Sequence, residues 1–361
     1  MIFAESALRM NQWRTAGVFV LLSLVATVAR ADYIDDYMRA QMAAFHLPGV
    51  SIAIVEDGKI TRTGAYGLSD VARNTPAAPD TVYKIASVSK QFIATAIMLL
   101  AQDGRLAVDD PIGRYLDGTP AAWQAITIRH LLAHTGGLVR ESPAFDPMKA
   151  KADADIVKAL YDVPLRFTPG VKWEYSNAGY YALAEIITRV SGKPWPQFLQ
   201  DRVFAPAGMK VTAPTNVQPT LSNRAVGYTG NDNTQPAAEW VALRPSGAFL
   251  STVFDLAKWD ALLYSNAILT EASRREMWLP VRLTDGTTYP YGFGWHVETM
   301  KNGRKAVWHA GGLPGFASYL GRFVDDKVTI IVLSNGNDAD IIAVGRGLAD
   351  EYLKRRETVT R

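Results

Sequence analysis

The stretch Ala86-Ser87-Val88-Ser89-Lys90 places a serine three residues before a lysine, at the start of an apolar segment that runs to Leu100. Apolar residues recur in this segment at helical spacing, which predicts a buried helix whose first turn carries both side chains. Residues three apart on a helix are neighbours. A lysine desolvated in an apolar site can lose its proton and then accept the proton of a serine hydroxyl. We therefore predict Ser87 as a nucleophile and Lys90 as its base.

A serine three residues before a lysine occurs by chance about once in a chain of this length, so the rest of the sequence must support the interpretation. A second candidate stretch is Trp173-Glu174-Tyr175-Ser176-Asn177, which lies between a Pro169-Gly170 turn and a helical pattern. A loop with Tyr and Asn at positions i and i+2 can aim both side chains into a cleft. The sequence thus offers a phenol and an amide besides the serine and the lysine.

Strand patterns occur near both ends of the chain. The segments 50–55 and 60–66 form a hairpin around an Asp-Gly turn, and the segments 291–298, 305–309, 316–323 and 328–333 have the signals of an antiparallel meander. Helical patterns occupy 33–45, 128–133, 150–160, 178–190, 251–263 and 338–354. We predict an α/β (α+β) fold with one antiparallel sheet, built from about 32–108 and 240–361 and covered by helices. A mostly helical region, about 109–239, is inserted between the two parts.

The first 31 residues have the features of a signal peptide. Arg9 and Arg14 precede an apolar run over 16–28, and Ala29-Arg30-Ala31 supplies small residues for cleavage after Ala31. An uncleaved anchor is the alternative, and Met10 is an alternative start. We expect a single hydrolase domain over 32–361, a periplasmic or secreted location, and no stable membrane span after processing.

The composition narrows the function classes. The chain has no cysteine, so it has no disulfide and no thiolate metal site, and its formal net charge is +3. Cleavage after Ala31 removes three Arg and one Glu, which leaves about +1 and gives no sign of a nucleic-acid partner. No His-Glu-x-x-His, phosphate-loop or G-x-G-x-x-G motif is present, and we predict no cofactor and no metal.

Three stretches follow one another in the chain: Ser87-x-x-Lys90, Tyr175-Ser176-Asn177 and Trp308-His309-Ala310-Gly311-Gly312. In this order and spacing they resemble the motifs of the serine β-lactamase-like hydrolases. That group holds class C β-lactamases, D-Ala-D-Ala carboxypeptidases and related esterases and D-aminopeptidases. The resemblance runs over about 49–336 and includes the segments 131–138 and 206–209.

The resemblance implies that Ser87 attacks a carbonyl group and that water hydrolyses the resulting acyl-enzyme. Lys90 and Tyr175 would share the proton transfers, and either of them is open as the general base. Asn177 would hold Lys90 and an amide of the substrate. The remaining expected residues lie in the third motif.

The third motif is expected to supply substrate and oxyanion contacts. The backbone N–H groups of Ser87 and Gly312 would form the oxyanion hole, and Gly311 and Gly312 would let the backbone approach the substrate closely. His309 stands where the family usually has Lys, and Ala310 stands where it usually has Thr. A neutral imidazole attracts a carboxylate less than an ammonium does, and Ala310 lacks the Thr hydroxyl, so we expect inefficient β-lactamase activity.

These observations predict an exported serine hydrolase that cleaves an ester or amide through an acyl-enzyme on Ser87. Within that class, the sequence leaves open a D-Ala-D-Ala carboxypeptidase-like peptidase, an esterase and, as an alternative, a β-lactamase. A non-catalytic penicillin- or peptidoglycan-binding module is the alternative from another class. The substrate is expected to be a small molecule or a peptide, with peptidoglycan-derived peptides among the candidates.

Overall fold

The computed structural model describes residues 32–215, 221–242, 244–247, 249–337 and 339–359, and the chain from Tyr33 onward forms one compact unit. The predicted signal peptide, 1–31, lies outside the described residues. No helix among the described residues has both the length and the apolar character needed to cross a membrane.

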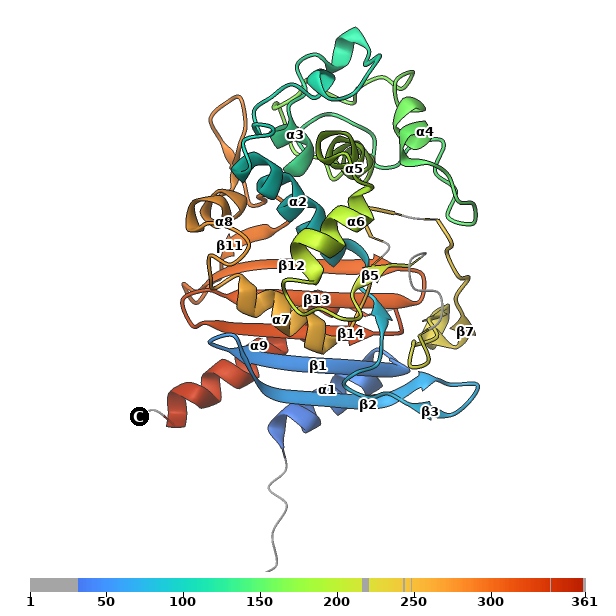
Figure 1. Cartoon of the computed structure of the whole chain (residues 1–361). Coiled ribbons are helices and arrows are strands. Elements are labelled where there is room, and N and C mark those ends of the chain that lie inside the picture. The colour runs from blue at the N-terminus through green and yellow to red at the C-terminus, as the bar shows by residue number, and fades with distance from the viewer. Residues whose placement is uncertain (1–31, 216–220, 243, 248, 338, 360–361) are drawn as a thin grey trace, which may run out of the picture. The chain divides into compact units, whose positions relative to one another are not determined.

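A seven-stranded antiparallel sheet organises the unit (Figure 1). Its strand order is β11-β12-β13-β14-β1-β2-β3, so the N-terminal hairpin joins the C-terminal meander through the β1–β14 pair, in which Val50 lies opposite Ser334. The prediction of one sheet built from both ends of the chain is confirmed. The strands are β1 (Gly49–Glu56), β2 (Lys59–Asp70), β3 (Thr75–Pro76), β11 (His296–Thr299), β12 (Lys305–Leu313), β13 (Phe316–Phe323) and β14 (Val328–Ser334).

Alternating side chains give the sheet two apolar faces. On β1, Ile52 and Ile54 point to the face covered by α1 (Tyr33–Ala44) and α9 (Ile341–Val359). Ala53 and Val55 point to the opposite face, where α7 (Val253–Leu262) packs on β1 and β14. Because both faces are buried, β1 and β14 are mostly apolar on both faces, and their few polar residues, such as Ser51 and Thr329, are buried as well.

The segment between β4 (Tyr83–Lys84) and β8 (Phe249–Ser251) is mostly helix and loop, and in Figure 1 most of its helices lie above the sheet, whereas its last part lies beside it. It begins with the 3₁₀ turn η1 (Ala86–Ser89) and the buried helix α2 (Lys90–Gln102), against which α5 (Ala178–Ser191) packs. Its other elements are η2 (Ile112–Arg114), η3 (Ala121–Trp123), α3 (Ile128–Leu132), α4 (Asp153–Lys158), α6 (Trp195–Leu199), η4 (Gln200–Phe204), β5 (Ala213–Pro214), β6 (Tyr228–Thr229), η5 (Asn231–Asn233) and β7 (Gln235–Pro236).

The sequence interpretation differs from the structure mainly before β11. We expected a strand over 291–298, but β11 begins only at His296, and the chain between α8 (Glu271–Met277) and β11 includes the short strands β9 (Val281–Arg282) and β10 (Thr288–Tyr289). Gly294 has φ +76°, and a Cβ there would lie 2.9 Å from the carbonyl oxygen of Lys90. This glycine ends the strand pattern and lets the chain pass against the start of α2.

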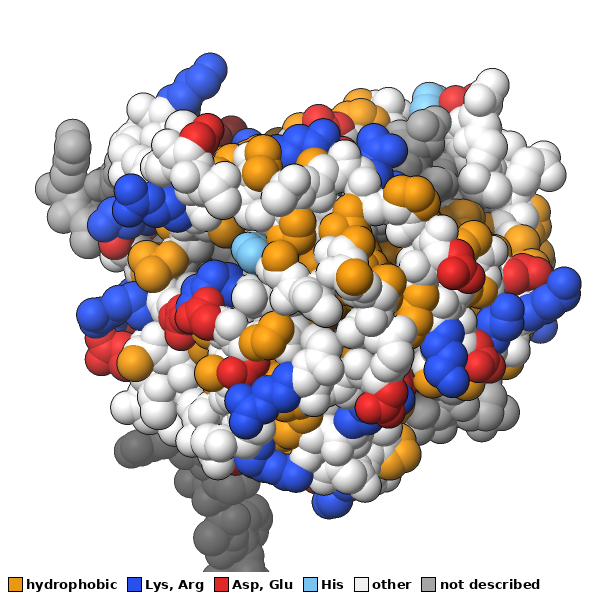
Figure 2. All heavy atoms as spheres, turned by 90° about the horizontal axis from the view of Figure 1, so that it is seen from above, with side chains coloured by type: hydrophobic (Ala, Val, Ile, Leu, Met, Phe, Trp, Pro, Cys, Tyr) orange, Lys and Arg blue, Asp and Glu red, His pale blue; other side chains and the backbone are white. Residues whose placement is uncertain are grey.

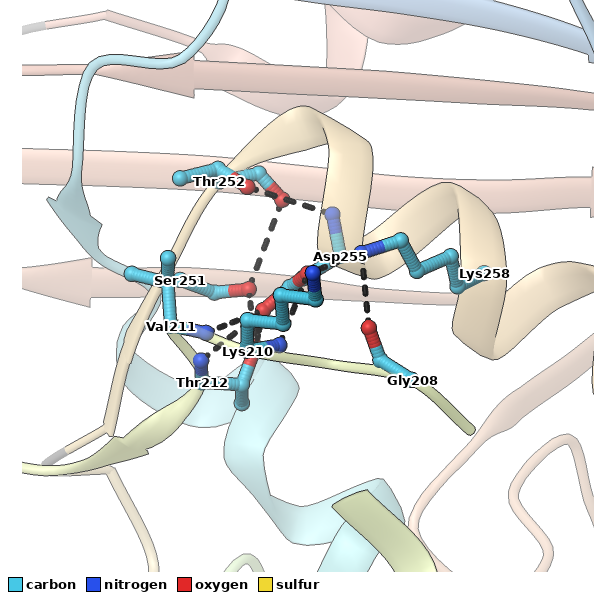
Figure 3. A network of polar contacts seen from close by, with 8 residues as sticks. All are labelled: Gly208, Lys210, Val211, Thr212, Ser251, Thr252, Asp255 and Lys258. Atoms are coloured by element: carbon cyan, nitrogen blue, oxygen red, sulfur yellow. Dashed lines mark hydrogen bonds and ion pairs between the residues drawn. The ribbon is translucent and has the colours of Figure 1, made fainter. Parts of the chain in front are cut away.

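A buried carboxylate ties the helical segment to α7 (Figure 3). Asp255 Oδ2 accepts hydrogen bonds from the backbone N–H groups of Val211 (2.8 Å) and Thr212 (2.9 Å), and Oδ1 accepts one from Lys258 Nζ (2.9 Å). The Thr252 hydroxyl caps α7 by accepting from the Asp255 N–H at 3.1 Å. Each of these bonds satisfies a group that burial would otherwise leave unpaired.

Candidate active site

The nucleophile candidate lies on the 3₁₀ turn that leads into α2. Ala86, the residue before Ser87, has φ +46°, a left-handed conformation that non-glycine residues adopt rarely and at a cost in free energy. The helix expected from Ser87 onward therefore begins as η1, and the α-helical part starts at Lys90. Ser87 is partly exposed and Lys90 is completely buried. The turn thus presents the hydroxyl to solvent and holds the amine beneath it.

Lys90 Nζ has three polar contacts. It lies 3.2 Å from Ser87 Oγ, 2.8 Å from Asn177 Oδ1 and 2.7 Å from the carbonyl oxygen of Ser246. Among the described residues no carboxylate lies within ion-pair distance of Nζ. The oxygens of Asn177 and Ser246 can only accept hydrogen bonds, so they take both N–H groups of a neutral amine and leave its lone pair for the Ser87 hydroxyl.

Aromatic rings surround the lysine. Nζ lies 4.7 Å from the ring centroid of Tyr175 and 5.3 Å from that of Tyr180. Burial is the main reason that the pKa of Lys90 falls well below 10.5, and the nearby Arg244 guanidinium lowers it further. Both effects favour the neutral amine, which is the form that can take a proton from Ser87.

Tyr175 lies beside the same hydroxyl. The Ser87 hydroxyl acts on the Tyr175 phenol and partly opposes the effect of burial on the phenol pKa. The Tyr175 ring lies 4.3 Å from the His134 ring, centroid to centroid. Burial raises the pKa of the Tyr175 phenol well above its usual value of 10.0. The phenol therefore stays protonated at neutral pH and is available as a proton donor.

Asn177 precedes α5 and connects the lysine to a charged pair. Its Nδ2 donates to Glu141 Oε1 at 2.5 Å, and the same carboxylate oxygen pairs with the Arg244 guanidinium. The Asn177 backbone N–H donates to the carbonyl oxygen of Arg140 at 2.8 Å. These bonds fix the orientation of the amide and direct its oxygen at Lys90.

β12 runs beside η1, and two glycines line this approach. A Cβ on Gly311 would lie 2.4 Å from the carbonyl oxygen of Ile85 and 2.9 Å from the Ala86 Cβ, so only glycine fits there. A Cβ on Gly312 would meet no atom within 4 Å, and this residue is exposed. Gly312 thus borders open space next to the nucleophile turn, and its role in an oxyanion hole stays a prediction.

His309 is buried and uses both ring nitrogens within the protein. Its Nε2 lies 3.0 Å from the Tyr291 hydroxyl, and its Nδ1 lies 2.6 Å from the carbonyl oxygen of Ala310. The Tyr291 hydroxyl also lies 3.2 Å from His134 Nε2, and His134 Nδ1 accepts from the Ser176 N–H. The Ser176 backbone N–H can only donate, and the Ala310 carbonyl oxygen can only accept. One arrangement of protons therefore satisfies this row of hydrogen bonds with both imidazoles neutral: His134 Nε2 donates to the Tyr291 hydroxyl, and that hydroxyl donates to His309 Nε2.

The surroundings of these histidines also favour the neutral form. Burial lowers the pKa of His134 and of His309 well below 6.5. Burial lowers the pKa of His296, which lies next to His309, to about 4. A substrate contact by His309 stays a prediction, and in this structure it would require a change in these hydrogen bonds.

The structure brings six of the seven residues predicted from the sequence into one connected region, and Gly312 borders it. Sequence reasoning missed Ser246, Arg244 and Glu141, which hold the lysine and the amide. None of these three residues lies in one of the motifs that the sequence analysis singled out. We also missed that Tyr291 connects His134 to His309.

Comparisons with known proteins show the family of this chain. A family model described as Beta-lactamase matches residues 34–351. Penicillin-binding protein 4* of Bacillus subtilis strain 168 is 33% identical over 306 residues, which cover 79% of this chain and 67% of that protein. Other curated relatives match over 63% of their length, so the chain spans about two thirds of the curated relatives that it matches.

Two solved structures have a similar fold. The octameric penicillin-binding protein homologue from Pyrococcus abyssi has a TM-score of 0.80 at 24% identity, over 89% of this chain and 77% of that one. The D-amino acid amidase from Ochrobactrum anthropi SV3, in complex with L-phenylalanine, has a TM-score of 0.75 at 25% identity, over 91% and 99%. The first similarity concerns the fold alone.

Proposed function

Because the chain belongs to the Beta-lactamase family of serine hydrolases, we propose that it hydrolyses an ester or amide through an acyl-enzyme on Ser87. One observation carries this proposal. The buried Lys90 amine lies 3.2 Å from the Ser87 hydroxyl, and its other polar contacts are a side-chain amide oxygen and a backbone carbonyl oxygen. An amine held in this way can act as a base at neutral pH.

The reaction has two steps. In the first, Lys90 takes the Ser87 proton, Ser87 Oγ bonds to the substrate carbonyl carbon, and the leaving nitrogen or oxygen departs with a proton supplied through Tyr175. In the second, water adds to the acyl carbon, gives one proton to the Lys90–Tyr175 pair, and displaces Ser87, which regains its own proton. We propose Lys90 as the base and Tyr175 as the donor, since burial acts on their pKa values in opposite directions.

For the substrate we propose an amide or ester bond next to a D-amino acid. The motif resemblance to D-Ala-D-Ala carboxypeptidases and the similarity to a D-amino acid amidase support this class. An esterase of broad acyl specificity and a β-lactamase are the other outcomes of the test below. Location in the periplasm or outside the cell, after removal of 1–31, belongs to the same proposal.

The test compares protein beginning at residue 32 with its Ser87→Ala variant. The substrates are a neutral short-chain aryl ester, a D-amino acid amide, acetyl-D-Ala-D-Ala and a chromogenic cephalosporin. We expect turnover of at least one of the first three, a rise in kcat/KM with pH as Lys90 loses its proton, and loss of turnover in Ser87→Ala. Binding of these compounds without turnover would instead favour a penicillin- or peptidoglycan-binding module.

A further inference from the structure

Two arginines approach the Ser87 site, and they differ in their partners. Arg244 is buried and paired with Glu141, so its charge is compensated. The Arg140 guanidinium is exposed, and within the described part of the chain no carboxylate lies at ion-pair distance from it. Its carbon Cζ lies 5.3 Å from the ring centroid of Tyr175. Arg140 therefore brings an uncompensated positive charge to the mouth of the site.

The position of Arg140 is defined by its backbone. Its carbonyl oxygen accepts hydrogen bonds from the N–H groups of Asn177 (2.8 Å) and Ala178 (3.1 Å) at the start of α5. The same helix start holds the Asn177 amide that contacts Lys90. Hence the guanidinium extends from a backbone anchored to the catalytic region, and it raises the local positive potential felt by both Tyr175 and Lys90.

The opposite side of the site offers no such charge. His309 is neutral, and both of its ring nitrogens are engaged. Ala310 ends at Cβ and packs with the residues on the other face of β12. A carboxylate on the substrate would therefore find no charged partner on the part of this strand that lies beside η1, since its one lysine, Lys305, is at the other end. Basic and acidic side chains are mixed on the face shown in Figure 2, so this face as a whole does not select anions either.

We propose that Arg140 binds a carboxylate on the leaving group of the substrate. Tyr175, which we assign as the proton donor, must face the leaving group, and Arg140 lies against its ring. A guanidinium matches the two oxygens of a carboxylate, and an exposed one can rotate to meet them. This inference rests on the proposed function and narrows it to substrates that end in a free acid, such as peptides with a C-terminal D-amino acid.

The experiment compares acetyl-D-Ala-D-Ala with its C-terminal amide, two ligands that differ only in the carboxylate. In the protein with intact Ser87 we expect a higher kcat/KM for the acid, and in Arg140→Gln we expect the acid-to-amide ratio to fall about tenfold. Arg140→Lys should keep part of the preference. Arg73→Gln, on the turn between β2 and β3 at the far edge of the sheet, is the matched control and should leave the ratio unchanged.

Binding to Ser87→Ala separates this inference from the proposed function. Calorimetry with the same two ligands does not require turnover, and we expect tighter binding of the acid, with the difference lost when Arg140→Gln is added. That result supports the inference even if Ser87-dependent turnover is not found. An equal effect of Arg140→Gln on acid and amide would mean that the guanidinium acts only by packing on Tyr175, and it would overturn the inference, as would no effect on either ligand.

Discussion

Two buried basic side chains of this protein have opposite surroundings. Arg322 on β13 pairs with Asp260 on α7, with 2.6 Å between Nε and Oδ1, and Thr329 donates to the same carboxylate oxygen. Lys90 is equally buried, but its partners are a hydroxyl, a side-chain amide and a backbone carbonyl. The first arrangement joins a helix to the sheet with both charges compensated. The second leaves a basic group uncompensated next to a nucleophile.

This difference in partners explains why Arg322 has a structural role, whereas Lys90 can react. A carboxylate next to Lys90 would stabilise the ammonium and keep its proton bound. Neutral partners with acceptor oxygens hold the amine in place without that effect. The negative charge of Glu141 lies beyond Asn177 and is itself paired with Arg244. The site therefore keeps the lysine oriented while its pKa stays low.

The largest effect is expected from Lys90→Met, which removes the base but keeps most of the volume. General-base catalysis contributes about 10² to 10⁴ in rate, so we expect kcat/KM to fall about 10³-fold. Unfolding in denaturant should show that the variant folds, since no carboxylate loses a partner. Activity within about tenfold of the parent would contradict the role of this lysine.

Arg322→Met tests the other half of the comparison. It leaves Asp260 buried without its cation, and we expect the free energy of unfolding to fall by about 3–5 kcal/mol. The activity of the molecules that remain folded should change little, because the pair lies between α7 and the sheet and contacts none of the site residues. Adding Asp260→Leu removes the second charge and should restore part of the stability. A double variant as unstable as the single one would argue against an unpaired charge as the cause.

The smallest effect concerns the pH dependence of stability. In the unfolded chain Lys90 keeps its proton up to about pH 10.5. In the folded protein its pKa is lower, so between that pKa and pH 10.5 the folded protein lacks the proton. The unfolded state thus binds more protons in this window, and stability rises with pH by about 1.4 kcal/mol per unit from this group. Lys90→Met should lack that increment.

Denaturant unfolding of both proteins at a series of pH values measures this difference. The charged neighbours Arg140, Arg244 and Glu141 are present in both, so most of their contribution cancels. A stability difference that is constant between neutral pH and pH 10 would mean that the folded-state pKa of Lys90 is not lowered.

The apolar periodicities of the sequence predicted the strands β1, β13 and β14 to within one or two residues, because these strands are buried on both faces. The order of the three motifs predicted the fold, which the family match and the solved structures confirm. The strand expected from 291 was too long, since the pattern of apolar residues does not report the positive φ of Gly294.

Residue types and spacing alone determined that Ser87 and Lys90 are neighbours, because both lie within one turn of the chain. Tertiary structure decided what the lysine touches: the amide of Asn177 and the carbonyl oxygen of Ser246 come from segments 87 and 156 residues away. It also left Arg140 exposed and Arg244 paired, although the two side chains are chemically identical. Burial and partners determine the charge state of a group, and both arise only when distant segments pack together.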